Sequence, residues 1–260
     1  MTLLIDIGNT RLKYVRHTEN GFTKSQSINN DEINVEQLAL LFSNEIEVIV
    51  SSVADNKLLE LIEQVAYKHQ ITIVRAQTQK ETNGVICGYD NYQQMGVDRW
   101  LAIIGAQCLV PNKYLIVVDA GTATTIDVID KNKKHLGGWI LPGVKTIHDA
   151  IIEKTAQVSS TFKPVEAIAF GLNTADNVNQ ASWAASIGLI EQAIRTLGSN
   201  QSLASDKIKL SIEIIFTGGN GAELAKLYRQ QSGLQVIGKY QVVDNLVFHG
   251  LNTYQKCATK

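Results

Sequence analysis

The sequence predicts an α/β protein built from two related domains. An apolar strand runs into Asp and Gly at 3–9 (LLIDIGN), and the same arrangement returns at 115–122 (LIVVDAGT). A strand that passes through a turn of small residues into a helix also occurs twice, at 48–62 and 214–228. Each half therefore consists of a strand hairpin followed by strand, turn and helix, which indicates a duplicated unit.

The first half alternates between apolar strands and amphipathic helices. Its predicted strands are 2–7, 11–17, 22–28, 47–51 and 71–75. Its predicted helices are 34–43, 55–69 and 93–108, each with apolar residues at helical spacing. Pro111 and Asn112 then break the pattern, so we divide the chain into domains 1–112 and 113–260.

The second half repeats this order with a longer helix. Its predicted strands are 114–119, 123–130, 211–216 and 234–238, and residues 199–206 are expected to form a loop. Its predicted helices follow Gly143 to about 156, cover 171–198, follow the turn at 218–221, and begin near 244. The glycines of GGWILPG (137–143) are expected to serve backbone geometry, and Trp139 and Trp183 to lie in a core or an interface.

Composition points to small-molecule chemistry. The chain has 260 residues, 45% of them hydrophobic, and a formal net charge of −1. Its basic residues are dispersed, which argues against a nucleic acid or an anionic membrane surface as partner. No segment approaches the ~20 apolar residues that cross a bilayer, and no basic leader is present, so we expect a cytoplasmic protein.

Cysteine and histidine offer no metal or disulfide pattern. Cys87, Cys108 and Cys257 are odd in number and far apart, and the five histidines are scattered. This spacing argues against a disulfide framework and a transition-metal site. A hard cation bound through oxygen atoms stays possible.

The two Asp-Gly turns are the strongest candidates for a binding site. Asp6 ends a buried strand, and Gly8 lets the main chain approach a bound group closely. Successive N–H groups in such a turn form a concavity for phosphate. A plain hairpin turn explains Asp6 equally well. A P-loop motif is absent, and GGNG (218–221) lacks the third glycine of a dinucleotide fingerprint.

Four segments in order carry a more specific resemblance. The two turns and the TGG at 217–219 resemble the actin, Hsp70 and sugar kinase superfamily, whose two ribonuclease H-like (actin-like) domains hold a nucleotide in the cleft between them. DIGNTRLK (6–13), YDNYQQMGVDR (89–99), DAGTATTID (119–127) and GGWILPG together resemble the type III pantothenate kinase family. The resemblance extends from Asp6 to the C-terminal helix.

The resemblance implies ATP-dependent phosphorylation of pantothenate to 4'-phosphopantothenate, the first step of coenzyme A biosynthesis. It assigns ATP to Asp6, Ile7, Gly8, Asn9, Thr10, Arg11, Leu12, Lys13 and Thr122. Asp6 is expected to order Mg²⁺ through water, because Mg²⁺ sheds its hydration reluctantly. Asp119 is assigned to a monovalent cation, K⁺ or NH₄⁺, against the alternative of a satisfied turn carboxylate.

The resemblance also assigns the acceptor site. Pantothenate is expected to contact Tyr89, Gly96, Val97, Asp98, Arg99 and Thr174. Asp98 is the expected catalytic carboxylate, and Arg99 can grip a carboxylate with two parallel N–H bonds. The alternatives are a helix-start residue for Asp98, a solvated charge for Arg99 and an N-cap for Thr174.

Tyr92 departs from the family pattern, which commonly has proline after the asparagine of YDN. The resemblance further implies a homodimer with the acceptor pocket at its interface. Two rival functions are an accessory factor in transcription regulation that retains the nucleotide-binding fold without catalysis, and a sugar kinase of the same superfamily. Asp98 and Arg99 are both present, which argues against loss of chemistry and against a neutral acceptor.

Overall fold

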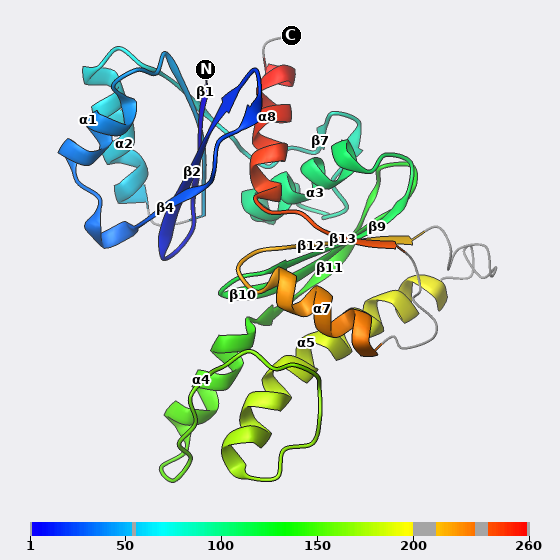
Figure 1. The fold of residues 1–260 in the computed structure, drawn as a ribbon. Helices are drawn as coiled ribbons and strands as arrows, with labels where there is room; N and C mark the ends of the chain where they lie inside the picture. Colours follow the sequence, from blue (N-terminus) through cyan, green and yellow to red (C-terminus); the bar gives the residue numbers. More distant parts are fainter. Residues whose placement is uncertain (1, 54–55, 200–211, 232–238, 259–260) are drawn as a thin grey trace. The chain divides into compact units, whose positions relative to one another are not determined.

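The computed structural model describes residues 2–53, 56–199, 212–231 and 239–258. The chain divides into two compact units (Figure 1). Unit 1 consists of Met1–Leu109 with Asn245–Lys260, and unit 2 consists of Val110–Asp244. Each unit has its own sheet with helices around it.

The sheet of unit 1 has the strand order β3-β2-β1-β5-β6, and β4 also pairs with β2. Its strands are β1 (Thr2–Ile7), β2 (Arg11–Thr18), β3 (Gly21–Phe22), β4 (Gln26–Asn29), β5 (Glu47–Ser52) and β6 (Thr72–Arg75). β1 is antiparallel to β2 and parallel to β5, which is parallel to β6. The single strand predicted at 22–28 is therefore two short strands.

The α-helices of unit 1 follow one another along the chain in the order that the apolar periodicity predicts. The helices are η1 (Asn30–Glu32), α1 (Val35–Phe42), α2 (Asn56–Lys68), η2 (Tyr92–Gln94), α3 (Val97–Leu109) and α8 (Leu246–Ala258). A small hairpin of β7 (Glu81–Thr82) and β8 (Val85–Ile86), which the sequence pattern did not predict, precedes η2. Asn34 begins α1 with a full capping box, and the buried Leu38 and Phe42 join α1 to the core of the sheet.

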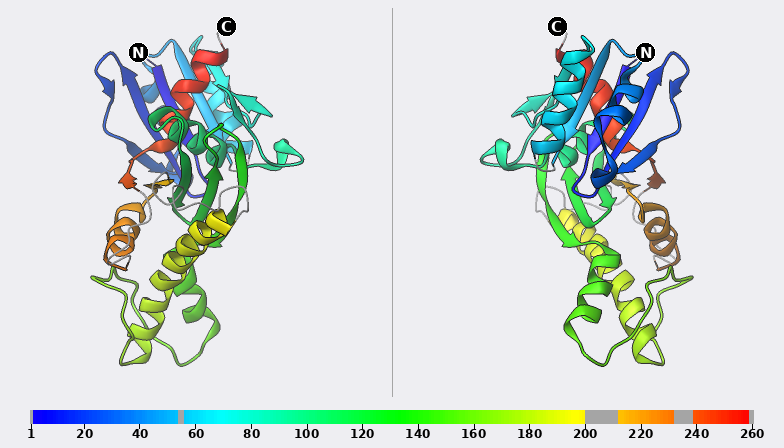
Figure 2. Two further views of the ribbon diagram at one scale, coloured as in Figure 1. Left: turned by 90° about the vertical axis from the view of Figure 1, so that its right-hand side faces the viewer. Right: turned by 90° about the vertical axis from the view of Figure 1, so that its left-hand side faces the viewer.

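The C-terminal helix α8 packs against α3 within unit 1 (Figure 2). The contact depends on two glycines: a Cβ on Gly105 would come within 2.5 Å of the Leu246 carbonyl oxygen, and one on Gly250 within 2.1 Å of the Leu101 carbonyl oxygen. The predicted boundary near 112 lies close to the end of α3, but the assignment of residues 245–260 to the second domain is wrong. Their contacts with α3 are long-range, so no local break in the sequence reveals them.

The sheet of unit 2 has the order β11-β10-β9-β12-β13. Its strands are β9 (Tyr114–Ala120), β10 (Ala123–Ile129), β11 (His135–Pro142), β12 (Ile212–Thr217) and β13 (Lys239–Val242). β9 is antiparallel to β10 and parallel to β12, which is parallel to β13. This is the arrangement of unit 1, so the predicted duplication is confirmed. GGWILP belongs to strand β11, which the sequence did not predict.

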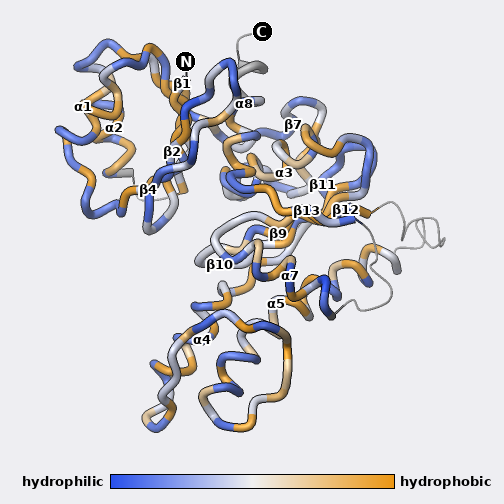
Figure 3. Tube along the Cα trace, in the orientation of Figure 1, coloured by the Kyte–Doolittle hydropathy of each residue, from blue (hydrophilic) through white to orange (hydrophobic). Residues whose placement is uncertain are grey.

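The helices of unit 2 are α4 (Val144–Lys154), α5 (Thr174–Ser199) and α7 (Gly221–Gln231). Hydrophobic residues follow the central strands in Figure 3, and fully buried Ile116, Val118 and Phe216 form the core with α5 and α7. Trp183 is buried there, as expected, and stacks on Phe162 with ring centroids 5.7 Å apart, whereas Trp139 is 37% exposed. Of the loop predicted at 199–206, Ser199 is the last residue of α5, and 200–206 lie outside the described residues, as does the strand predicted at 234–238. Among the described helices, none is long and apolar enough to cross a membrane.

Candidate functional site

The turn between β1 and β2 presents polar residues at the end of a hairpin whose first strand is mostly buried. Gly8 N donates to Arg11 O at 3.0 Å, and a Cβ on Gly8 would lie 3.4 Å from that oxygen. The side chains of Asn9, Thr10, Arg11 and Lys13 are exposed. Ile7 and Leu12 are fully buried, so any contribution from them to a ligand would come through the backbone.

Asp6 lies half-buried at the end of β1, opposite Lys13 on β2 and Ser51 on β5. Ser51 Oγ donates to Asp6 Oδ1 at 2.8 Å. The pKa of Asp6 is raised to about 6, mainly by burial and also by the negative charge of Asp98, while the Ser51 hydrogen bond and Lys13 act in the opposite direction. Asp6 and Asp98 are therefore close enough to interact, and a cation beside Asp6 would favour its ionised form.

Asp98 lies in the first turn of α3, where its Oδ1 accepts a hydrogen bond from Arg99 N at 2.7 Å. Asp98 is thus a helix-start residue, as the alternative interpretation expected. At this position its carboxylate is also close enough to Asp6 to influence the pKa of Asp6. A Cβ on Gly96 would come within 2.6 Å of Asp98 Oδ1. Gly96 therefore leaves the space that this carboxylate occupies.

Arg99 and Tyr89 form a pair next to this carboxylate. Arg99 Nη1 donates to the Tyr89 hydroxyl at 2.8 Å, and its guanidinium carbon lies 5.8 Å from the centroid of the tyrosine ring. Arg99 is only 7% exposed, so its interpretation as a solvated charge is wrong. A buried guanidinium held by a tyrosine is an oriented donor for an anionic ligand.

A polar pocket of about 680 Å³ in unit 1 adjoins these residues. Its lining includes Ser52 at the end of β5, Arg75 at the end of β6, Lys80, and Tyr92–Val97. Two of the lining side chains are basic and none is acidic. Tyr92, which takes the place of the family proline, lies in η2 and lines this pocket.

The corresponding carboxylate of unit 2 is Asp119 on β9. It lies opposite Thr125 on β10 and Thr217 on β12. A Cβ on Gly218 would come within 2.4 Å of Asp119 Oδ1, and Gly218 has a φ of +84°, so glycine is required there on two grounds. Asn220 N donates to Ala120 O at 3.0 Å and ties the TGGNG turn to the end of β9.

Thr122 lies in the β9–β10 turn against the start of α4. Its carbonyl oxygen accepts hydrogen bonds from Gly143 N and Thr146 Oγ1, both at 2.8 Å. A Cβ on Gly143 would come within 2.2 Å of Gly121 O. The last glycine of GGWILPG therefore permits this close approach, and the exposed Thr122 side chain stays available.

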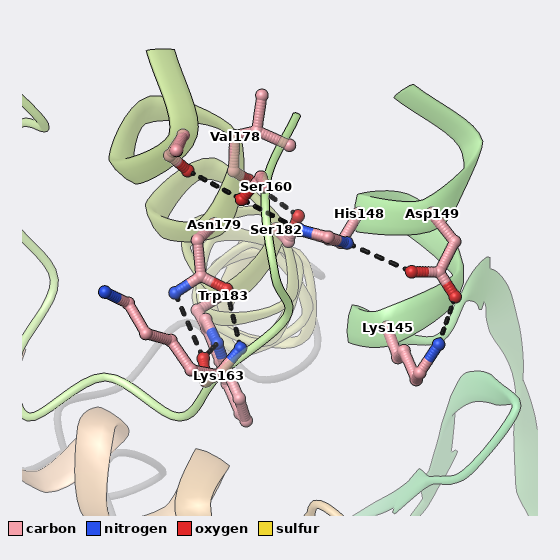
Figure 4. A network of polar contacts seen from close by, with 10 residues as sticks. Lys145, His148, Asp149, Ser160, Lys163, Val178, Asn179, Ser182 and Trp183 are labelled. Carbon is pink, nitrogen blue, oxygen red and sulfur yellow. Dashed lines mark hydrogen bonds and ion pairs between the residues drawn. The ribbon is translucent and has the colours of Figure 1, made fainter. Parts of the chain in front are cut away.

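Thr174 is the first residue of α5, but it is not the cap. Asn173 Oδ1 accepts a hydrogen bond from Asp176 N at 2.9 Å, so the N-cap interpretation of Thr174 is wrong by one residue. A side-chain network holds the preceding segment onto α5 (Figure 4). His148 Nε2 lies 3.1 Å from Ser160 Oγ, which donates to Ala175 O at 3.1 Å.

Sequence reasoning missed residues that support these turns. Ser51 bonds to Asp6, Thr146 bonds to the Thr122 carbonyl, and Asn30 bonds to the β1–β2 turn. Ser51 and Thr217 occupy matching positions in the repeat, which is the one signal that could have found Ser51. Among the described residues, no group of three or more His, Cys, Asp or Glu could hold a metal ion.

Comparison with known proteins identifies a family. A family model described as type III pantothenate kinase matches residues 2–196. Type III pantothenate kinases from Colwellia psychrerythraea and Pseudoalteromonas translucida are 36% and 35% identical to this chain, over 98% and 88% of it and 100% and 89% of their own lengths.

Solved structures share the fold. A protein from Campylobacter jejuni described as a Baf family transcriptional activator has a TM-score of 0.61 at 24% identity, with 98% of this chain and 97% of that chain covered. A Sinorhizobium meliloti protein described as a 2-dehydro-3-deoxygalactonokinase has a TM-score of 0.59 at 13% identity, with 99% of each chain covered. These likenesses show the actin-like sugar kinase fold.

Proposed function

The chain belongs to the type III pantothenate kinase family, which phosphorylates pantothenate in coenzyme A biosynthesis, and we propose that Asp98, Asp6 and Arg99 carry out this reaction here. The observation that supports the proposal is the cluster in unit 1. The charge of Asp98 acts on Asp6, while Arg99 is buried beside Asp98 and held by Tyr89. The proposed base Asp98, the proposed cation-binding carboxylate Asp6 and the proposed anion-binding Arg99 are thus close together in unit 1.

Asp98 is the proposed base. It accepts the proton of the pantothenate hydroxyl as that oxygen forms a bond to the γ-phosphorus of ATP, the bond to the bridging oxygen breaks, and ADP leaves. Its carboxylate already accepts the Arg99 N–H, which fixes its orientation. Gly96 leaves room for it, because any side chain there would push it aside.

Arg99 is the proposed partner of the pantothenate carboxylate. The Tyr89 hydroxyl takes one of its donors, and this contact orients the planar group. Val97 and Gly96 line the adjoining pocket, where the acceptor would lie. Thr174, exposed at the first residue of α5, is a further proposed contact with pantothenate.

The β1–β2 turn is the proposed site for the ATP phosphates. Asn9, Thr10, Arg11 and Lys13 offer exposed donors, and Gly8 keeps the backbone open. Asp6 fits a magnesium ion held through water, because a half-buried carboxylate with a raised pKa gains from a nearby cation. Magnesium supplies neutralisation of the phosphate charge when bound.

The β9–β10 turn is proposed to contact ATP through Thr122 and a monovalent cation through Asp119. The Asp119 carboxylate over Gly218, together with the carbonyl oxygens around this turn, is an oxygen donor set that suits K⁺ or NH₄⁺. Thr122 keeps an exposed hydroxyl while its own carbonyl is fixed by two hydrogen bonds.

A homodimer is proposed from the surface of unit 2. Ile140 on β11 is 65% exposed, and Phe170 and Leu172, which shortly precede Thr174, are 102% and 98% exposed. Large apolar side chains in such positions are typical of protein interfaces. Sedimentation of the wild type should give a dimer, and Phe170→Asp should give a monomer with little turnover. A fully active monomer would contradict this.

The function is tested by a coupled assay with ATP, Mg²⁺, K⁺ and pantothenate. Wild type should release ADP only when pantothenate is present, and Asp98→Asn should lower kcat by about 10³-fold while its affinity for ATP, measured by calorimetry, stays unchanged. Asp90→Asn is the matched control, since Asp90 is an exposed carboxylate of the same segment.

The outcomes separate the rival functions. Binding of ATP by the wild type without phosphate transfer to pantothenate would overturn the enzymatic proposal in favour of an accessory factor. Transfer to a neutral polyol in preference to pantothenate would favour a sugar kinase. The Arg99→Lys variant distinguishes a pantothenate kinase from a sugar kinase. Loss of the bidentate geometry should raise the KM for pantothenate and leave the KM for a polyol acceptor unchanged.

A further inference from the structure

Asn30 is the first residue of η1, directly after β4, and it touches the β1–β2 turn at three points. Its Nδ2 donates to Gly8 O at 2.8 Å and to Asn9 O at 3.2 Å. Its backbone N–H donates to Thr10 O at 3.0 Å. One residue therefore holds the carbonyls of three consecutive turn residues.

These contacts fix the orientation of the amide. Both partners of the Asn30 side chain are carbonyl oxygens, which only accept, so the group facing them must be the NH₂. Asn30 Oδ1 points elsewhere and is buried, with no hydrogen-bond partner among the described residues. The side chain thus serves the turn with its donors alone.

The orientation of the turn's N–H groups follows from peptide geometry. In a trans peptide the C=O of one residue and the N–H of the next point in opposite directions, and no cis peptide occurs among the described residues. Holding the carbonyls of Gly8 and Asn9 toward Asn30 turns the N–H groups of Asn9 and Thr10 away from it. Two successive N–H groups that point away from the protein in a turn are the donors from which an anion-binding concavity is built.

From this geometry we infer that Asn30 is a positioning residue that pre-forms the phosphate-binding face of the β1–β2 turn. The inference depends on the function proposed above, in which this turn binds the phosphates of ATP. Asn30 acts through the backbone of Gly8, Asn9 and Thr10 and does not itself contact the nucleotide. Its loss should therefore weaken binding of ATP without changing the acceptor site.

A matched control lies next to it. Asn29 is the same residue type in the same segment, but its Nδ2 donates to Glu32 Oε1 at 2.8 Å, and its pairing with Arg11 on β2 is a strand pairing that the substitution of its side chain leaves in place. Asn30→Ala removes both side-chain donors from the turn, while Asn29→Ala removes one exposed hydrogen bond. Asn30→Asp preserves the volume of the side chain and replaces the donors with acceptors, so it keeps the test usable if the alanine variant folds poorly.

The experiment measures Mg²⁺-ATP affinity by calorimetry together with steady-state kinetics. Asn30→Ala should raise the Kd and KM for ATP about tenfold, the effect of losing two hydrogen bonds, and leave the KM for pantothenate within about twofold. Asn30→Asp should raise the ATP constants at least as much, because a carboxylate then faces two carbonyl oxygens. Asn29→Ala should match the wild type in all of these constants.

The results distinguish this inference from the proposed function. If the wild type fails to bind Mg²⁺-ATP, the proposed function itself fails. If the wild type binds Mg²⁺-ATP but Asn30→Asp and Asn30→Ala bind it equally well, only the role of Asn30 is overturned. If the KM for ATP and the KM for pantothenate rise together, Asn30 supports the fold in general and does not position the turn.

Discussion

The two Asp-Gly turns lie on sheets of the same topology but differ in the charges that they carry. Asp6 and Asp119 each lie near the end of the central strand of their sheet, and each lies opposite a hydroxyl residue on the parallel neighbour, Ser51 or Thr217. The first turn adds exposed Arg11 and Lys13. The second has no basic residue between Asp119 and Asp127.

The turns are also held in different ways. A side chain from outside the hairpin, that of Asn30, fixes the first turn. The second is fixed by the backbone N–H of Gly143 and by Thr146 at the start of α4. The duplicated unit therefore provides two polar turns, and we expect the phosphate charge to be neutralised mainly at the first.

The largest expected effect tests this asymmetry. Lys13→Ala should lower kcat/KM for ATP by about 10² to 10³-fold, since it removes a cation from the developing phosphate charge. Thr122→Ala removes one neutral hydroxyl from the second turn and should cost about tenfold or less. Steady-state kinetics at constant ionic strength measures both. Lys24→Ala, an exposed lysine of the same unit, is the control; equal losses at Lys13 and Thr122 would refute the asymmetry.

The next effect concerns stability and pH. The pKa of Asp6 is raised from 3.8 to about 6, so the folded state holds this proton more tightly than the unfolded state does. The wild type should therefore lose stability as the pH rises from about 4 to about 6, by at most about 3 kcal/mol. Asp6→Asn should be more stable than the wild type at pH 7.5 and equal to it near pH 4. Urea unfolding without ligand measures the difference; an Asn variant that is less stable at both pH values would contradict the cause given for the shift.

Local pattern predicted much of the architecture, because each hairpin is a short-range structure. A continuous apolar run that ends in an Asp-Gly turn suffices to specify β1–β2 and β9–β10, and the repetition of this pattern indicated two units with one topology. Strand β11 was not predicted, because its sequence HLGGWILP contains two glycines and mostly exposed residues. Its extended conformation depends on its pairing with β10.

Contacts between distant residues explain the other differences. The attachment of α8 to unit 1 depends on Gly105 meeting Leu246, 141 residues later in the chain. Asp6, Asp98, Arg99 and Tyr89 were proposed from motifs, and the structure brings these four residues together in unit 1. Asn30 belongs to no motif, since its role comes from one amide that reaches 22 residues back along the chain.

Glycine at the second turn provides a test of intermediate size. Gly218 combines a φ of +84° with a Cβ position 2.4 Å from Asp119 Oδ1, whereas Gly219 has nothing within 4 Å of its Cβ position. Gly218→Ala should lower the free energy of unfolding by about 2 kcal/mol and raise the concentration of K⁺ that gives half-maximal activity. Gly219→Ala should change neither quantity appreciably. If the two variants respond alike to K⁺, the carboxylate over Gly218 does not serve the cation.

The smallest effect compares the two hydroxyl partners. The Ser51 hydrogen bond lowers the pKa of Asp6 against the larger effect of burial, so Ser51→Ala should raise that pKa above about 6. The acidic limb of kcat/KM for ATP should then move to higher pH by less than about one unit, since activity requires ionised Asp6. Thr217→Val, at the matching position of unit 2, should leave the limb in place because Thr217 is the strand neighbour of Asp119. A shift of equal size in both variants would mean that the limb reports both turns, and that the charge needed for catalysis is shared between the halves of the repeat.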